Sequence, residues 1–381
     1  MVSVSGFRGR VGDPLTPELV CELAGEFTSF LRERNNGKVL VVARDSRTSG
    51  SMLARAVCAG ILSRGVNVLD LGIVATPTAM LTVEKKNALG GIMISASHNP
   101  AEWNALKLVS HDGSFLDVTM MTSFLNYISE ESQGNLAPWD QLGSYQSEEN
   151  ASDTHVKEIL DLSVLDLQRL RKRKFKVALD CVRGAGGVIM PLLLEALGCE
   201  VVAIHTEVDG KFPRDPEPTA DNLLELSHLV KTTGAEVGFA VDPDVDRLSL
   251  VDEHGTPLGE DMTLAFATDV VLNNRPGSVV TNLSTSQVID DVVRHHGGQL
   301  TRTSVGEINV VRGMQKQEAP IGGEGNGGVI LSELHHTRDA PLAAALVLQH
   351  LLERNEAPSE CASRWPRYVI QKTKITISKE K

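Results

Sequence analysis

The chain is poor in cysteine and in aromatic residues, and it contains no long uninterrupted apolar run. Its cysteines are scattered and form no CxxC pair, so the sequence predicts neither a disulfide framework nor a zinc site. Isolated cysteines are typical of a protein in the reducing cytoplasm, which is where we expect this one to act. The residues are Cys21, Cys58, Cys181, Cys199 and Cys361.

Membrane segments are not indicated by the sequence. The longest apolar stretch, Ala340 to Leu352, is interrupted by Gln349 and His350. At this length it predicts a buried helix rather than a membrane span. The N-terminal residues lack the basic and then apolar pattern of a signal peptide. We therefore expect no membrane partner.

Positive charge is in deficit. The 37 lysines and arginines are outnumbered by 49 aspartates and glutamates, which gives a formal net charge of −12. A nucleic-acid-binding protein needs a basic face, so this balance argues against a nucleic-acid partner. Small anionic substrates remain compatible with it, because local positive clusters can oppose the global charge.

One pattern occurs three times: a strand, a polar turn, an amphipathic helix, a glycine and a second strand. Such units form mostly parallel sheets covered by helices. The predicted fold class is therefore α/β, with three similar domains of mixed, mostly parallel sheets covered by helices and arranged around a central cleft. The copies begin at Lys38, Phe175 and Ser278, their helices span 51–64, 188–197 and 286–296, and their glycines are Gly65, Gly198 and Gly297.

Polar stretches suggest where the domains divide. The first boundary is expected near the end of the segment 132–152, and the second near the turn that begins at Asp252. The predicted domains are residues 1–150, 151–253 and 254–367. Residues 368–381, which include a strand-like run at 373–377, are expected to form a linker.

A short motif, Ser95-Ala-Ser-His-Asn-Pro100, follows an apolar run that ends at Ile94. The run predicts a buried strand, and the proline and small polar residues predict a turn after it. Ser97 would then lie at the exposed carboxyl end of a strand, where open α/β sheets hold their ligands. A solvated turn would explain a lone serine, but two motifs downstream complete a set that suits phosphoryl transfer.

The second motif has three alternating aspartates, Asp242, Asp244 and Asp246, which follow a predicted strand and precede Arg247. Three carboxylates this close repel one another unless a cation lies among them, and hard oxygen ligands suit Mg²⁺. An EF-hand calcium loop does not fit, because Arg247 stands where that loop needs glycine.

Two other interpretations of the acidic motif compete with a magnesium site. A solvated acidic turn would explain a bare Asp-x-Asp pair. A magnesium-dependent aspartyl phosphatase would use Asp242 as its nucleophile. The phosphatase interpretation leaves the Ser97 motif without a role.

The third motif, Ile321 to Ile330, has five glycines around Glu324 and Asn326. Glycines let the backbone approach a ligand closely, and the two polar side chains suit the donors and acceptors of sugar hydroxyl groups. A flexible hairpin is the simpler alternative for a glycine-rich loop.

Together and in this order, the motifs resemble the α-D-phosphohexomutase family of phosphoglucomutase, phosphomannomutase and phosphoglucosamine mutase. The resemblance covers nearly the whole chain. It implies that Ser97 is phosphorylated in the active enzyme and also contacts the metal. It implies that Asp242, Asp244 and Asp246 bind Mg²⁺ beside Arg247.

The resemblance assigns further residues to the substrate. Glu324 and Asn326, with Gly325 between them, match the sugar-recognition loop. Arg8, in Gly6-Phe-Arg-Gly, matches an arginine that approaches the phosphoserine, and Lys107 matches the lysine of an Asn-Gly-x-Lys element. Phosphosugars are the implied substrates of a monomer or homodimer.

The implied reaction consists of two phosphoryl transfers. Phospho-Ser97 donates to a hexose monophosphate, and the resulting hexose 1,6-bisphosphate, which is also the activator, returns its other phosphate. Such transfer rests mainly on positioning and charge. Arg247 would stabilise the phosphoryl group, and His98 would orient the Ser97 loop. Lys107 is the candidate general acid or base if the cationic site lowers its pKa, and a phosphate clamp is its alternative role.

Two positions differ from better-known members of the family. The sugar loop ends in Asn326-Gly-Gly328 where those members have Ser-Gly-His, and Val305-Gly-Glu307 stands where some relatives have Val-Gly-His. The Glu-Gly-Asn-Gly-Gly form is similar to a phosphoglucosamine mutase subgroup. Phosphoglucomutase or phosphomannomutase activity is the alternative.

The family also has a fourth domain, whose Arg-x-Ser-Gly-Thr loop grips the non-reacting phosphate, and no such loop is found in this sequence. Two or three charge-assisted hydrogen bonds of about 1.5–3 kcal/mol each amount to about a thousandfold in binding. Without them, we expect the chain to hold Mg²⁺ and accept phosphate on Ser97 but to turn over poorly. An impaired sugar-phosphate-binding chain is therefore an alternative function.

Overall fold

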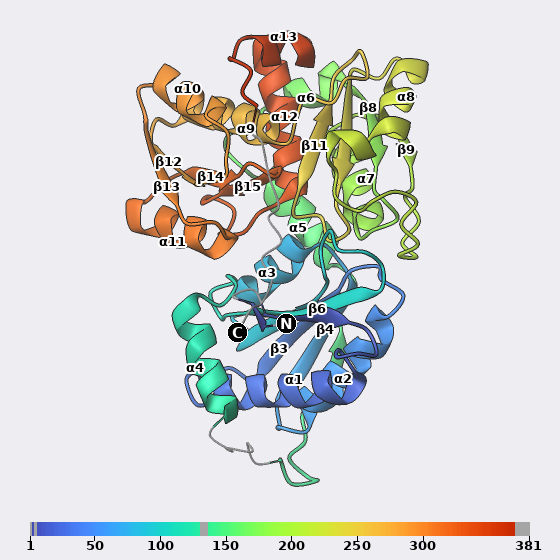
Figure 1. Cartoon of the computed structure of the whole chain (residues 1–381), viewed down its shortest axis with the longest axis vertical. Helices are drawn as coiled ribbons and strands as arrows, with labels where there is room; N and C mark the ends of the chain where they lie inside the picture. Colours follow the sequence, from blue (N-terminus) through green and yellow to red (C-terminus); the bar gives the residue numbers. More distant parts are fainter. Residues whose placement is uncertain (1, 4–5, 130–135, 370–381) are drawn as a thin grey trace, which may run out of the picture.

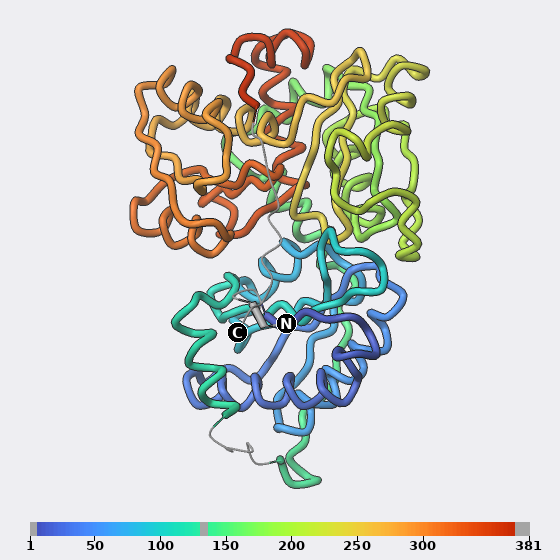
Figure 2. Tube along the Cα trace, in the orientation of Figure 1, coloured from blue at the N-terminus to red at the C-terminus, as the bar shows by residue number. Residues whose placement is uncertain are grey.

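The structure is a computed structural model of the chain, and it describes residues 2–3, 6–129 and 136–369. They form three α/β units, with the first lying below the other two in Figure 1. The tube in Figure 2 shows the second and third units side by side above it. Within the described residues, no helix combines the length and the apolar character needed to cross a membrane.

The first unit is built on a seven-stranded sheet with the order β1-β2-β6-β5-β3-β4-β7. Alternate residues of β3 face opposite sides, so that Leu40 and Val42 pack with α1 and α2 while Val41 and Ala43 pack with α3. The strands are β1 (Val2–Ser3), β2 (Gly6–Arg10), β3 (Val39–Arg44), β4 (Asn67–Ile73), β5 (Gly90–Ile94), β6 (Trp103–Val109) and β7 (Tyr145–Ser147). The helices are α1 (Pro17–Arg32), α2 (Gly50–Leu62), α3 (Thr76–Lys85) and α4 (Val118–Ser129).

The second unit has a four-stranded sheet with the order β11-β10-β8-β9. Helix α7 covers one face of this sheet and α8 covers the other. The strands are β8 (Lys176–Asp180), β9 (Glu200–Ile204), β10 (Val237–Val241) and β11 (Leu248–Val251). The helices are α5 (Ala151–Leu160), α6 (Leu167–Arg173), α7 (Gly186–Ala196), α8 (Leu224–Thr233) and a 3₁₀ turn at Ala220–Asn222.

The third unit has another four-stranded sheet, with the order β13-β12-β14-β15. Helix α11 covers one face, and α9, α10 and α12 pack on the other. The strands are β12 (Ser278–Asn282), β13 (Gln299–Thr303), β14 (Ile321–Glu324) and β15 (Gly328–Leu331). The helices are α9 (Asp261–Asn274), α10 (Val288–His295), α11 (Glu307–Gln317), α12 (Ala340–Arg354) and α13 (Pro358–Ser363).

The three units share one arrangement of four strands. In each, two strands of a strand–helix–strand copy pair in parallel. A third strand pairs in parallel on the other side, and the fourth closes an antiparallel hairpin with it. These pairings confirm the predicted α/β fold with mixed, mostly parallel sheets. Gly65, Gly198 and Gly297 have the positive φ expected after a helix.

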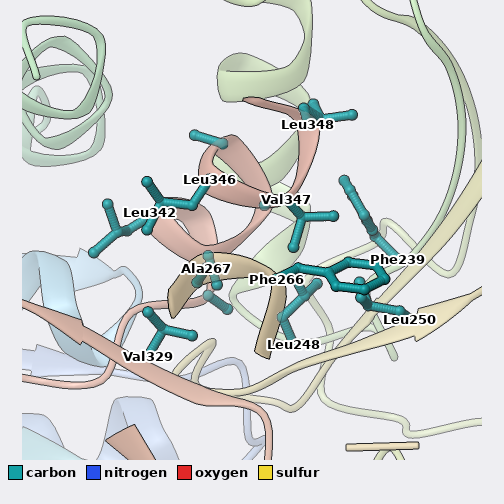
Figure 3. Close-up of a cluster of buried hydrophobic side chains, with 14 of the residues drawn as sticks. Phe239, Leu248, Leu250, Phe266, Ala267, Val329, Leu342, Leu346, Val347 and Leu348 are labelled. Atoms are coloured by element: carbon teal, nitrogen blue, oxygen red, sulfur yellow. The ribbon is translucent and has the colours of Figure 1, made fainter. Parts of the chain in front are cut away.

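One hydrophobic core joins the second and third units, as Figure 3 shows in close-up. Phe239 and Leu250 enter it from the second sheet, Val329 enters from the third, and Phe266 lies on α9 between them. Helix α12 is buried from Ala340 to Leu352, which confirms the helix expected for the apolar stretch. The two sheets are therefore held to each other by apolar packing.

One element was not expected from the sequence. Strand β7 lies in the polar segment predicted as a boundary, and it pairs in parallel with β4 at the edge of the first sheet. Its residues are exposed, so the sequence has no hydrophobic alternation there that would predict a strand. The divisions proposed after residues 150, 253 and 367 stay predictions. The strand-like run at 373–377 lies outside the described residues.

Candidate functional site

The three sequence motifs lie at the same topological position in their units. Ser97 follows β5, the aspartates follow β10, and Glu324 ends β14, so each motif lies at the carboxyl end of the first hairpin strand. This is the edge at which α/β sheets hold ligands. The fold thus presents three different chemistries from one repeated hairpin.

Ser97 has the backbone conformation of a constrained turn. Its φ is +50°, in the left-handed region that is uncommon for residues other than glycine. The Ser97 N–H donates to Ser95 Oγ, and the Ser95 hydroxyl donates to Asp45 Oδ2. Only 4% of Ser97 is exposed, so the expected exposed position is wrong and the serine lies at the base of a cavity.

Arg47 determines the shape of the Ser97 loop. Its buried guanidinium donates to the carbonyl oxygens of Ser97 and Asn99, both at 2.6 Å, and to those of Pro100 and Trp103 at 2.7 and 3.1 Å. Asp45 balances its charge at 3.0 Å. Arg47 was not predicted from the sequence, because a lone arginine far from Ser97 gives no local signal of such contacts.

The three aspartates are fully buried, and the protein holds at least one oxygen of each. Asp242 Oδ1 accepts the backbone N–H groups of Asp246 and Arg247 at 3.1 and 3.2 Å. Asp244 Oδ2 accepts from Lys107 Nζ and Thr76 Oγ1, both at 2.5 Å. Asp246 Oδ2 accepts from Arg338 Nη2 of the third unit at 2.5 Å. These contacts therefore limit the orientations that each carboxylate can adopt.

The remaining oxygens of the triad suit a divalent cation. Ser97 Oγ donates to Asp242 Oδ2 at 2.9 Å. Among the described residues, the buried Asp244 Oδ1 and Asp246 Oδ1 have no hydrogen-bond partner. One potential ligand atom from each aspartate lies within 4.8 Å of the others. Buried acceptors without partners are costly, and a hard cation would satisfy these oxygens.

Charge crowding is visible in the pKa values. Burial, with the charges of Asp246 and Asp244, raises the pKa of Asp242 well above its usual range. Burial would also raise the pKa of Asp244, but the charge and hydrogen bond of Lys107 outweigh it and lower that pKa. One carboxyl of the triad therefore resists ionisation until more positive charge arrives.

Lys107 does not meet the condition set for a general base. Burial alone would lower its pKa, but the charges of Asp244 and Asp246 outweigh burial and raise it. The condition of a lowered pKa is therefore not met, because the lysine faces carboxylates more closely than other cations. Its Nζ lies 2.5 Å from Asp244 and 3.9 Å from Asp246.

Three further predicted residues line the same cavity as Ser97. His98 Nδ1 lies 3.4 Å from Ser97 Oγ, and burial together with the charge of Arg247 lowers its pKa to about 4. Arg8 donates to Asn99 Oδ1 at 2.8 Å, and Arg247 donates to Glu217 Oε1 at 3.1 Å. The two arginines therefore border the Ser97 loop and the aspartate loop, residues 242–247, which is the expected metal loop.

The sugar loop contributes two side chains to the cavity. Glu324 is buried, and its Oε1 accepts from Asn282 Nδ2 at 2.6 Å. Asn326 donates to Glu324 Oε2 at 3.4 Å. Gly325 points elsewhere: its N–H donates to Thr285 Oγ1, and within the described part of the chain it does not line this cavity. A substrate would therefore meet Glu324 and Asn326 rather than Gly325.

The cavity has a volume of about 410 Å³ and brings residues of all three units together. Its polar wall includes Ser97, Lys107 and Glu324, and its apolar wall includes Phe115 and Ile308. Most ligand sites have this composition, with apolar walls and a few convergent polar groups. The volume is suited to a small polar molecule such as a sugar phosphate.

Two more cavity residues, Arg338 and Glu307, were not predicted from the sequence. Arg338 precedes α12 and donates to Asp246 Oδ2 at 2.5 Å and to Glu324 Oε2 at 2.8 Å. Glu307, at the start of α11, accepts from Arg338 Nε at 3.1 Å and from Thr337 Oγ1 at 2.6 Å. Glu307 was marked in the sequence only by the Val305-Gly-Glu307 difference from some relatives. Arg338 belongs to no motif.

Comparisons with known proteins agree with this architecture. Family models described as phosphoglucomutase/phosphomannomutase alpha/beta/alpha domains I, II and III match residues 2–135, 153–255 and 259–368.

Two curated relatives are similar over nearly the whole chain. A probable phosphoglucosamine mutase of Methanopyrus kandleri is 35% identical over 380 residues, which cover 99% of this chain and 81% of the relative. A phosphoglucomutase/phosphomannomutase of Thermococcus kodakarensis is 35% identical over 372 residues, covering 97% and 81%. A solved structure of a phosphoglucomutase/phosphomannomutase family protein from Burkholderia thailandensis superposes with a TM-score of 0.85 at 28% identity, covering 97% and 81%.

Proposed function

This chain belongs to the phosphoglucomutase/phosphomannomutase family, and we propose that it interconverts hexose 1-phosphate and hexose 6-phosphate through a phosphoserine at Ser97 and a hexose 1,6-bisphosphate intermediate. Its relatives are mutases, so the chain is an isomerase of the phosphohexomutase class. One observation carries the proposal: Ser97 Oγ contacts the acidic triad in the same cavity that Glu324 and Asn326 line. The nucleophile, the metal ligands and the sugar contacts therefore converge.

The proposed metal ligands are Asp242, Asp244, Asp246 and Ser97. When bound, Mg²⁺ would balance the charge of the phosphoryl group. The protein's own part is to present one oxygen of each carboxylate, since the other is already held. The raised pKa of Asp242 supports this assignment, because a carboxyl crowded by like charges is stabilised by a cation.

The cationic residues would hold and orient the phosphoryl group. We propose that Arg8 and Arg247 attract it from either side of the Ser97 loop. Lys107, whose pKa is raised, would serve as a protonated clamp or acid and not as a base. His98, neutral above its lowered pKa, would orient Ser97 without adding charge.

The hexose is the finer part of the proposal. Phosphoglucosamine mutase is our first choice, because the Methanopyrus relative carries that name and the loop form matches that subgroup. Phosphoglucomutase or phosphomannomutase activity is the alternative, because the Thermococcus relative carries that name and is also 35% identical to this chain. Measuring kcat/KM for glucosamine 6-phosphate, glucose 6-phosphate and mannose 6-phosphate on one preparation would rank the three.

The mechanism is tested by phosphate transfer from labelled hexose 1,6-bisphosphate, with Mg²⁺, onto the native chain and onto Ser97→Ala. We expect a label on the native chain that is absent from the variant and stable to hydroxylamine. A hydroxylamine-sensitive label on Asp242 would favour the aspartyl phosphatase instead. The geometry disfavours that reaction, because Asp242 Oδ1 is held by two backbone N–H groups and its other oxygen accepts from Ser97. Absence of label on both chains would contradict the proposal.

A further inference from the structure

Arg338 makes ion pairs with three carboxylates that belong to two units of the fold. Its Nη2 lies 2.5 Å from Asp246 in the metal loop, and its Nη1 lies 2.8 Å from Glu324 in the sugar loop. Its Nε lies 3.1 Å from Glu307. A planar guanidinium has donors on three sides, which a lysine lacks. One side chain therefore links the two loops directly.

The backbone around Arg338 is fixed as firmly as its side chain. The Arg338 N–H donates to Glu307 Oε1 at 3.0 Å. The next residue, Asp339, caps α12 by accepting from Leu342 N and also accepts from His155 and His335, both at 2.8 Å. Because α12 lies in the core shared by two units, Arg338 projects from a rigid support.

The neighbouring hairpin leaves the space that Arg338 fills. A Cβ atom on Gly328, the first residue of β15, would lie 2.3 Å from Arg338 Cδ and 2.8 Å from its Cγ. Gly328 is not among the glycines with positive φ in the described chain. Its backbone conformation is therefore open to other residues, and the Arg338 side chain is the main obstacle to one, with Asn326 Oδ1 next at 3.2 Å.

Building on the proposed function, we propose that Arg338 is a positioning residue that couples Mg²⁺ binding by the aspartate loop to hexose recognition by Glu324. Arg338 holds Asp246 Oδ2, so that Asp246 Oδ1 is left for the metal, and with the same guanidinium it holds Glu324 Oε2. A ligand that orders either carboxylate also orders the other. The second ligand then loses less conformational entropy when it binds, which makes the coupling positive and reciprocal.

The first test measures this coupling by calorimetry on the dephosphorylated chain. Mg²⁺ is titrated with and without saturating glucosamine 6-phosphate, or glucose 6-phosphate if that proves the better substrate. We expect the sugar phosphate to tighten Mg²⁺ binding roughly tenfold. In Arg338→Lys this tenfold factor should fall towards one, because lysine keeps the positive charge but lacks N–H donors on three sides. The matched control is Arg354→Lys, which alters an ion pair with Asp269 at the far end of α12 and should keep the tenfold factor.

The second test leaves every charge in place. Gly328→Ala should displace Arg338 and reduce the coupling as Arg338→Lys does, with folding checked by circular dichroism. Its control is Gly50→Ala, whose new Cβ would lie 3.2 Å from the Cδ of Arg44, away from the cavity. This variant keeps the proposal testable if Arg338→Lys does not fold.

The outcomes separate this inference from the proposed function. Coupling that persists in folded Arg338→Lys or Gly328→Ala would overturn the role of Arg338. A direct contact between the metal and the phosphate would then explain the coupling. Labelling of Ser97 in the native chain is measured on the same samples. If the native chain is not labelled, the mutase mechanism fails, whereas labelling with unchanged coupling contradicts only the inference about Arg338.

Discussion

The hairpins β10–β11 and β14–β15 occupy the same place in sheets of the same topology, yet one carries three carboxylates and the other carries five glycines around a single carboxylate. In the first, the proposed metal ligands are side chains, and their charges need partners from elsewhere in the fold. In the second, the backbone must come close: a Cβ on Gly327 would lie 2.4 Å from the carbonyl oxygen of Leu248 in the first hairpin. The two loops therefore depend on different properties, charge in one and small volume in the other.

The difference shows how a repeated unit acquires separate functions. The metal loop is charge-dense, so its stability depends on Lys107 from the first unit and Arg338 from the third. The sugar loop has a single carboxylate, already paired with Arg338 and Asn282. Charge substitutions should therefore have their largest effects in the first hairpin and smaller ones in the second.

The largest effect should follow from Asp242→Asn. Loss of one metal ligand charge is expected to lower phosphate transfer to Ser97 about a thousandfold. The melting temperature in EDTA should rise by a few degrees, because the substitution removes like-charge repulsion from a carboxyl whose pKa is already raised. Transfer assays and thermal melts with and without Mg²⁺ check both effects. Asp252→Asn, in the turn after β11, is the control, and equal effects in both variants would contradict the special role of the triad.

Lys107→Met tests how much the metal loop depends on an external cation. Removing one partner of a buried pair typically costs about 3–5 kcal/mol, because an unpaired carboxylate is left behind. Chemical denaturation in EDTA would measure the loss. Lys85→Met breaks an exposed pair with Glu158 and should cost less than about 1 kcal/mol. Similar losses in the two variants would show that Asp244 does not need Lys107.

The pH dependence of Lys107 follows from its raised pKa. A lysine with a raised folded-state pKa stabilises the protein fully below its unfolded pKa of about 10.4. This contribution is lost as the pH rises through the folded-state value. The native chain and Lys107→Met should therefore differ most in stability below pH 10 and converge in more alkaline solution.

Glu324→Gln examines the second hairpin. Loss of a charge-assisted hydrogen bond to the sugar should lower kcat/KM by about tenfold to a hundredfold, in line with about 1.5–3 kcal/mol. Most of the change should lie in KM, and Mg²⁺ affinity measured without sugar should change much less. If Mg²⁺ affinity fell as far as sugar affinity, the separation of roles between the two hairpins would be wrong.

The smallest expected effect concerns the third hairpin, β5–β6, and His98. Its pKa is lowered to about 4, compared with about 6.5 for an unfolded imidazole. The neutral ring stabilises the fold above pH 6.5, and this stabilisation is lost as the pH falls from 6.5 towards 4. In EDTA the native chain should lose on the order of 1 kcal/mol more than His98→Gln over this range. His254→Gln, at an exposed histidine, should behave like the native chain.

The sequence predicted those features that depend on local patterns. The three strand–helix–strand copies were found because apolar periodicity and a glycine after each helix are properties of neighbouring residues. Strand β7 could not be predicted, since its exposed residues owe their conformation to pairing with β4. The shared core around α12 was also hidden, because a buried apolar helix does not specify its partners.

In the candidate site, too, the features set by local motifs were predicted and those set by distant contacts were not. Motifs placed Ser97 and the aspartates at the ends of strands, and the structure brings Ser97 within hydrogen-bond distance of Asp242. The pKa direction of Lys107 stayed open at the level of the sequence, because it depends on Asp244, which is distant in sequence. Arg47 and Arg338 were missed for the same reason, since each acts through contacts that only the folded chain creates.

The guanidinium of Arg47 affects how the Ser97 loop responds to phosphorylation, because Ser97 is proposed to change charge twice in every turnover. An imidazole or a carboxylate holding the Ser97 loop could gain or lose a proton as phosphate arrives and leaves. A guanidinium stays protonated throughout the pH range of proteins, so the four carbonyl oxygens that it holds keep one donor set in every state. The loop would then have the same shape for the hydroxyl and for the phosphate, and neither half of the cycle would require the loop to refold.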